Sequence, residues 1–172
     1  VDGRFDTAVK ITEWSDDILT DQLLIADLDR NGVGDIITAP RNTIMVLHSN
    51  ADGTFRSSTA AAGDPYDIVV TDVDRDGYLD VLVDSSNTSA TVIHGSGRGV
   101  IERTSTLPLP SAAARTTGDV TGDGLDDLIL GTIFNRPLEE YRIYPALASG
   151  GYAAPVVRSL PLGSNHTAAL AV

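Results

Sequence analysis

The stretch DLDRNGVGD at residues 27–35 recurs as DVDRDGYLD at residues 72–80 and as DVTGDGLDD at residues 119–127. Short runs rich in β-forming residues lie on both sides of every copy, and a further run and a glycine-containing turn follow each one. Four strands in a repeat of about 45 residues are typical of propeller blades. The repeat therefore predicts an all-β fold built from β-propeller blades, each with four antiparallel strands.

The predicted strands are short apolar runs that end at Gly, Asn, Asp or Ser. No segment keeps an apolar period of 3.6 residues, so the pattern argues against helices. The expected first, second and third strands of the three repeats include residues 22–26, 36–38 and 43–48, then 66–71, 81–83 and 90–94, and finally 115–118, 128–130 and 141–144.

The repeat also predicts how the chain is divided. The run VDGRF at residues 1–5 matches ADGTF at residues 51–55, and residues 166–172 resemble the run before each acidic loop. We expect part of a larger propeller of about seven blades, or one completed by a second chain; the alternative is a small closed ring in which the two end strands share a blade. The predicted units are the last strand of a preceding blade at 1–14, blades at 15–61, 62–108 and 109–163, and the first strand of a following blade at 164–172.

Alternate residues of each acidic loop carry oxygen donors, the ligands that calcium prefers. Glycine at position 6 permits a sharp bend with positive φ, and the position 7 carbonyl would add a backbone ligand. An EF-hand is excluded, because position 12 is Thr38, Val83 or Leu130 rather than glutamate. The alternative is an Asx-rich turn without metal. Positions 1, 3, 5, 7 and 9 are Asp27, Asp29, Asn31, Val33 and Asp35; Asp72, Asp74, Asp76, Tyr78 and Asp80; and Asp119, Thr121, Asp123, Leu125 and Asp127. Three Ca²⁺ sites are predicted.

The composition limits the partners. The chain has 172 residues, no cysteine and a formal net charge of −12. Disulfides therefore cannot stabilise it, and nucleic acid or an anionic membrane is a poor partner, because phosphate binding requires clustered lysine and arginine. No apolar stretch is long enough to span a bilayer.

The pattern DxDxDGxxD between two strands resembles the FG-GAP/VCBS repeats of β-propellers of the integrin α-subunit type. The resemblance implies calcium sites of a usually structural kind and a role in extracellular recognition. Such repeats also occur in lectins and beside the catalytic domains of secreted hydrolases and lyases. Asn31 and Thr121 depart from the pattern, which prefers aspartate there; this puts affinity in doubt more than ligation.

No motif of a catalytic site is present, whether a GxSxG elbow, an HExxH helix or a P-loop. His48 and His94 occupy matching repeat positions, in VLHS and VIHG, which argues against a unique catalytic base, and His166 lies outside this register. Trp14 and Tyr66 are candidate ligand contacts, because aromatic faces suit sugar rings; the alternative is packing between blades.

Together these observations predict a non-catalytic, calcium-binding recognition or adhesion propeller, secreted or at the cell surface. Its expected ligand is a carbohydrate or glycoprotein, as for a lectin. The alternative is an accessory or catalytic-face propeller part of a secreted hydrolase or polysaccharide lyase.

Overall fold

The computed structural model describes residues 22–40, 42–62, 67–86, 88–98, 100–110, 112, 114–132 and 138–161. Within these ranges the chain forms twelve β-strands and no helix, which confirms the predicted all-β class. None of the described residues belongs to a helix long and apolar enough to cross a membrane. The terminal units predicted at 1–14 and 164–172 lie outside the described residues.

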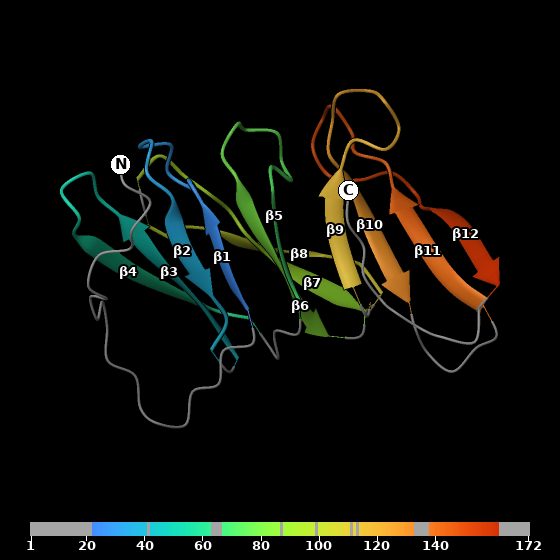
Figure 1. Cartoon of the computed structure of the whole chain (residues 1–172), viewed down its shortest axis with the longest axis horizontal. Helices are drawn as coiled ribbons and strands as arrows, with labels where there is room; N and C mark the ends of the chain where they lie inside the picture. The colour runs from blue at the N-terminus through green and yellow to red at the C-terminus, as the bar shows by residue number, and fades with distance from the viewer. Residues whose placement is uncertain are drawn as a thin grey trace, which may run out of the picture.

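The strands form three antiparallel sheets, each of which follows the order of its strands along the chain (Figure 1). The first sheet contains β1 (Leu23–Ala26), β2 (Asp35–Thr38), β3 (Thr43–Ser49) and β4 (Phe55–Ala61). The second contains β5 (Ile68–Thr71), β6 (Asp80–Ser86), β7 (Ser89–Ile93) and β8 (Thr104–Leu107). The third contains β9 (Ala114–Gly118), β10 (Asp127–Thr132), β11 (Leu138–Tyr144) and β12 (Val156–Pro161).

The sheets pack face to face, as neighbouring propeller blades do. In the middle sheet, side chains of β6 alternate between the two neighbours, as a strand requires. Val81 and Val83 join a core shared with the first sheet, whereas Leu82 joins a core shared with the third. All three are fully buried, and each such side chain stabilises the fold by about 1.5–3 kcal/mol. β5 also lies beside β9, as the innermost strands of adjacent blades would.

Each acidic loop joins the first and second strands of its sheet. The three loops project from the same edge of the molecule, the upper edge in Figure 1. The strand pairing makes equivalent positions explicit, because Leu47, Ile93 and Tyr144 each pair with the residue that follows a loop. The next residues, His48, His94 and Pro145, are therefore equivalent as well.

Candidate metal centres

The aspartate at position 9 of every loop is completely buried, with 0% exposure in all three sheets. In the first sheet, Asp35 accepts hydrogen bonds from the N–H of Leu28 at 3.0 Å and of Ser49 at 2.9 Å. One carboxylate thus ties the start of the loop to the end of β3. The equivalent donors are Val73 (2.8 Å) and Gly95 (2.9 Å) to Asp80, and Val120 (3.1 Å) and Ala146 (2.9 Å) to Asp127.

Burial and hydrogen bonds act in opposite directions on these carboxylates. Burial raises the pKa of Asp80 above its ordinary value, although two backbone N–H groups and His94 act against it. Burial also acts to raise the pKa of Asp127, but the backbone hydrogen bonds outweigh it and the pKa is lowered. A nearby cation would favour the ionised form of both groups.

The loop backbone is held by its own aspartates. Asp27, at position 1, accepts hydrogen bonds from the N–H of Asn31 at 3.0 Å and of Gly32 at 2.9 Å. Asp119 accepts the equivalent bond from Gly124 at 2.8 Å. The position 6 glycines have φ between 84° and 93°, as the loop pattern predicts. The position 7 residues direct their N–H groups at the position 5 side chains: Val33 to Asn31 at 2.8 Å, Tyr78 to Asp76 at 2.9 Å and Leu125 to Asp123 at 2.9 Å.

Position 4 is also left-handed in every loop, with φ of 57° at Arg30, 63° at Arg75 and 80° at Gly122. Sequence reasoning missed this feature, since arginine does not signal positive φ and only Gly122 offered a hint. The arginines reach the next loop along the edge. The Arg30 guanidinium lies 5.3 Å from the centre of the Tyr78 ring, and Arg75 donates to the carbonyl of Asp126 at 3.4 Å.

The second loop brings its acidic side chains together. One carboxylate oxygen from each of Asp72, Asp74 and Asp76 lies within 4.8 Å of the other two. Asp72 Oδ1 is buried and has no hydrogen-bond partner. Three like charges at this distance repel one another, and a buried carboxylate oxygen without a donor is unfavourable. A hard cation would relieve both, so these residues fit a metal ion.

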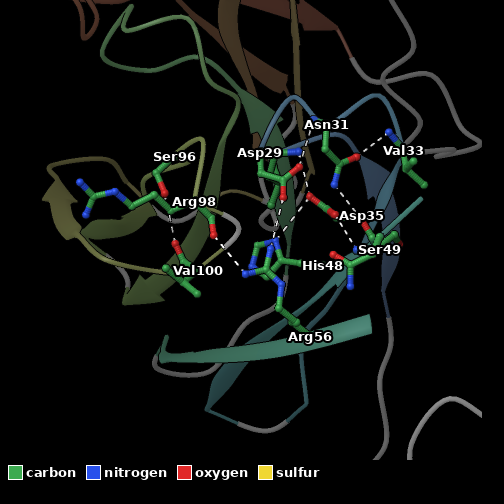
Figure 2. A network of polar contacts seen from close by, with 12 residues as sticks. Asp29, Asn31, Val33, Asp35, His48, Ser49, Arg56, Ser96, Arg98 and Val100 are labelled. Atoms are coloured by element: carbon green, nitrogen blue, oxygen red, sulfur yellow. Dashed lines mark hydrogen bonds and ion pairs between the residues drawn. The ribbon is translucent and has the colours of Figure 1, made fainter. Parts of the chain in front are cut away.

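The first loop holds its position 5 side chain differently. Asn31 donates from Nδ2 to the carbonyl of Ser49 at 2.7 Å. An amide can make this bond and a carboxylate cannot, because a carboxylate has no donor. Asn31 therefore ties the loop to β3 (Figure 2). In the third loop, Thr121 donates its backbone N–H to Asp127 at 2.9 Å.

A second kind of group contains a histidine. Carboxylate oxygens of Asp29 and Asp35 lie within 4.8 Å of each other and of a ring nitrogen of His48, and Asp74, Asp80 and His94 form the equivalent group. Figure 2 shows the first group, in which Asp29, Asp35 and His48 converge from the acidic loop, β2 and β3. Acidic residues and histidine in these groups could together hold a metal ion. Sequence reasoning identified both histidines as repeat positions but did not place them beside the loops.

Arginine side chains lie at the rim of both histidine groups. Arg56 Nη2 is 3.8 Å from Asp29 Oδ2, and Arg103 pairs with Asp74 Oδ2. Burial acts to raise the pKa of Asp74, but the Arg103 guanidinium and His94 outweigh it, and the pKa is lowered. Burial lowers the pKa of His48, against the attraction of Asp35 and Asp29.

The candidate ligand contacts Trp14 and Tyr66, and also His166, lie outside the described residues. They stay predictions.

Comparison with protein families identifies an FG-GAP-like repeat at residues 27–83. The match begins at the first aspartate of the first loop, includes the whole second loop and ends in β6. It agrees with the resemblance seen in the sequence and indicates a β-propeller-like domain. A comparison with curated proteins finds no match.

Proposed function

We propose that this chain is a calcium-binding, non-catalytic recognition module of β-propeller blades, secreted or at the cell surface. The observation that carries the proposal is the convergence of Asp72, Asp74 and Asp76 around the buried, unpartnered Asp72 Oδ1. Carboxylates in a tight loop are typical of calcium sites, whereas Mg²⁺ usually keeps several waters. The ion would hold the loop in its bent shape and so stabilise the strands on both sides.

The proposed ligands are the side chains at positions 1, 3, 5 and 9 and the carbonyl at position 7 of each loop. The carboxylate count differs between loops, since only the second has aspartate at positions 1, 3, 5 and 9. Calcium affinity follows ligand charge. The second loop is therefore the tightest of the three proposed sites.

The proposed partner is a carbohydrate or a glycoprotein. The net charge of −12 disfavours nucleic acid and anionic membranes. The FG-GAP-like repeat at residues 27–83 supports a recognition role, because repeats of this kind resemble those of adhesion receptors and lectins. The three sheets supply a rigid support for exposed loops, and in this proposal they are part of a larger propeller.

Calorimetry tests the calcium sites separately from the partner. Titration of the calcium-free chain should show one site tighter than the others, and Asp74→Ala should weaken it by more than about tenfold. Asp29→Ala, the matched change in the first loop, should leave that tightest site in place. Equal binding by the parent and Asp74→Ala would contradict the ligand assignment.

A glycan array tests the partner. The calcium-loaded chain should bind a defined set of glycans and lose them in EDTA. If the calorimetry succeeds and no glycan or glycoprotein binds, the calcium assignment stands and the carbohydrate assignment is wrong.

A further inference from the structure

Two buried histidines each have a ring nitrogen, Nδ1, that faces carboxylate oxygens but makes no hydrogen bond to them. His48 is 3% exposed and His94 is 6% exposed. In both, Nδ1 is buried and makes no hydrogen bond. An unsatisfied buried polar atom is costly, so its repetition at equivalent positions of two sheets calls for a physical reason.

The other ring nitrogen is fixed by a serine on the neighbouring strand. His48 Nε2 lies 3.0 Å from Ser58 Oγ, and His94 Nε2 lies 2.8 Å from Ser105 Oγ. A neutral histidine that donates from Nε2 presents a lone pair at Nδ1. In that tautomer, with the serine hydroxyl as acceptor, the ring has the arrangement of a metal-binding histidine, whose second ring nitrogen donates to an outer partner.

The Nδ1 atoms point at carboxylate oxygens. His94 Nδ1 is 3.2 Å from Asp74 Oδ2 and 3.5 Å from Asp80 Oδ1, and His48 Nδ1 is 3.6 Å from Asp35 Oδ2. Two ligands on one tetrahedral zinc ion, with bonds of about 2.0–2.2 Å, lie about 3.3–3.6 Å apart. A lone pair that faces carboxylates at this spacing is repelled unless a proton or a metal cation lies between them. Neither Nδ1 atom has the geometry of a hydrogen bond to a carboxylate, which favours the metal.

We propose that the first and second sheets each hold a zinc-type divalent ion, bound by Asp29, Asp35 and His48 in one sheet and by Asp74, Asp80 and His94 in the other. The mixed nitrogen and oxygen donor set distinguishes these centres from calcium sites, because imidazole suits zinc and other transition metals while calcium takes oxygen. Three protein ligands leave a fourth position for water.

The third sheet supports a joint role for the position 3 aspartate, the position 9 aspartate, the histidine and the serine. Of the equivalent four positions, it keeps only the position 9 aspartate. At the positions equivalent to Asp74, His94 and Ser105 it has Thr121, Pro145 and Val156. The position 9 aspartate, Asp127, is retained and keeps its backbone hydrogen bonds. That residue has a folding role in every sheet, whereas the histidine, the serine and the position 3 carboxylate are present together or absent together.

The rim arginines can give way to an ion. Arg56 and Arg103 side chains are 50% and 56% exposed, so both guanidinium groups can turn to solvent when a cation binds. Zinc and calcium would compete in the first two sheets, since the position 3 and position 9 carboxylates belong to both proposed ligand sets. The zinc proposal itself does not require calcium to bind.

The test is a titration of the calcium-free full chain with ZnCl₂ by calorimetry. Two tight sites are expected. His48→Asn and His94→Asn should each remove one site, with a loss of more than about tenfold in affinity, and the double variant should lose both. His166→Asn is the matched control and should keep two sites. Zinc binding that is unchanged in the double variant would overturn the proposal.

A second measurement covers the case in which the histidine variants fold poorly. Nitrogen-15 spectra of the imidazole rings of the unaltered chain should show two Nδ1 resonances that shift on zinc addition, by direct coordination, and that shift much less on calcium addition. Absence of any zinc-dependent shift would overturn the proposal even if calcium binds normally. If zinc shifts these resonances and the chain does not bind calcium, the zinc proposal stands and the calcium proposal is wrong.

Discussion

Each of the three sheets has a completely buried aspartate at position 9 of its acidic loop. The residues around this aspartate differ between the first two sheets and the third. In all three, the position 9 carboxylate accepts hydrogen bonds from a backbone N–H of its own loop and from one at the end of the third strand (Ser49) or two residues beyond it (Gly95 and Ala146). Only the first two place a histidine beside that carboxylate; the third has Pro145 there. The comparison separates the buried aspartate, which every sheet uses to hold its loop, from the histidine, which only the first two sheets place beside it.

The largest expected loss of stability follows from removing the buried position 9 aspartate, which all three sheets have. Replacing Asp35, Asp80 or Asp127 with alanine leaves two or more N–H groups unsatisfied. Each lost hydrogen bond to a carboxylate is worth about 1.5–3 kcal/mol, so each variant should lose at least about 3 kcal/mol of unfolding free energy in EDTA. Urea unfolding measures this loss, with exposed Asp52→Ala as the control. A much smaller loss in the third sheet would break the proposed equivalence.

The second prediction concerns the contact between the second and third sheets. Tyr152 packs against the core that these sheets share, and burial raises its pKa from 10.0 to about 12. The folded chain therefore holds this proton more tightly than the unfolded chain does. The contribution of Tyr152 to stability is constant below pH 10 and should fall by about 3 kcal/mol as the pH rises from 10 to 12.

Thermal melts between pH 9 and pH 12 measure that loss, with Tyr152→Phe as the control. The phenylalanine variant should lose less stability over the same range. An identical alkaline decline in both proteins would show that another group is responsible.

The third prediction compares two glycines with the same backbone conformation. Gly32, in the first loop, and Gly150, in the turn between β11 and β12, both have φ of 86°. A Cβ at Gly32 would meet nothing within 4 Å, whereas one at Gly150 would lie 2.8 Å from the carbonyl oxygen of Asp74 in the second loop. Gly32→Ala should cost about 1–2 kcal/mol, the penalty of a left-handed residue.

Gly150→Ala should cost more than Gly32→Ala, because the backbone must also shift, and it should disturb the second loop. Unfolding in denaturant gives the two costs, and Gly151→Ala, with open space around its Cβ, is a further control. Equal losses of unfolding free energy at positions 32 and 150 would mean that Gly150 does not pack tightly against the second loop.

Much of the fold could be predicted because the acidic loops mark where strands end and begin. The strands before and after each loop and the order of strands in each sheet follow from short apolar runs between turn residues. The left-handed conformation of Arg30 and Arg75 could not be predicted, because it opposes the ordinary preference of arginine. Tertiary contacts between neighbouring loops accompany that conformation, and no local pattern encodes them.

The sequence showed which residue types gather in the acidic loops but showed less of their geometry. Spacing alone placed Asp35 among loop ligands, but it did not show that this carboxylate is buried and bound to backbone N–H groups. The histidines were visible as repeat positions. Their approach to the loop aspartates depends on strand register, because His48 comes 13 residues after Asp35 and His94 comes 14 after Asp80.

The most direct test of the calcium account is thermal unfolding of the full chain in EDTA, in millimolar calcium and in millimolar magnesium. An ion that binds only the folded state adds about 2.7 kcal/mol per site at a hundredfold excess over its dissociation constant. We expect a clear rise in melting temperature with calcium and little change with magnesium. Equal melting temperatures in EDTA and calcium would contradict it.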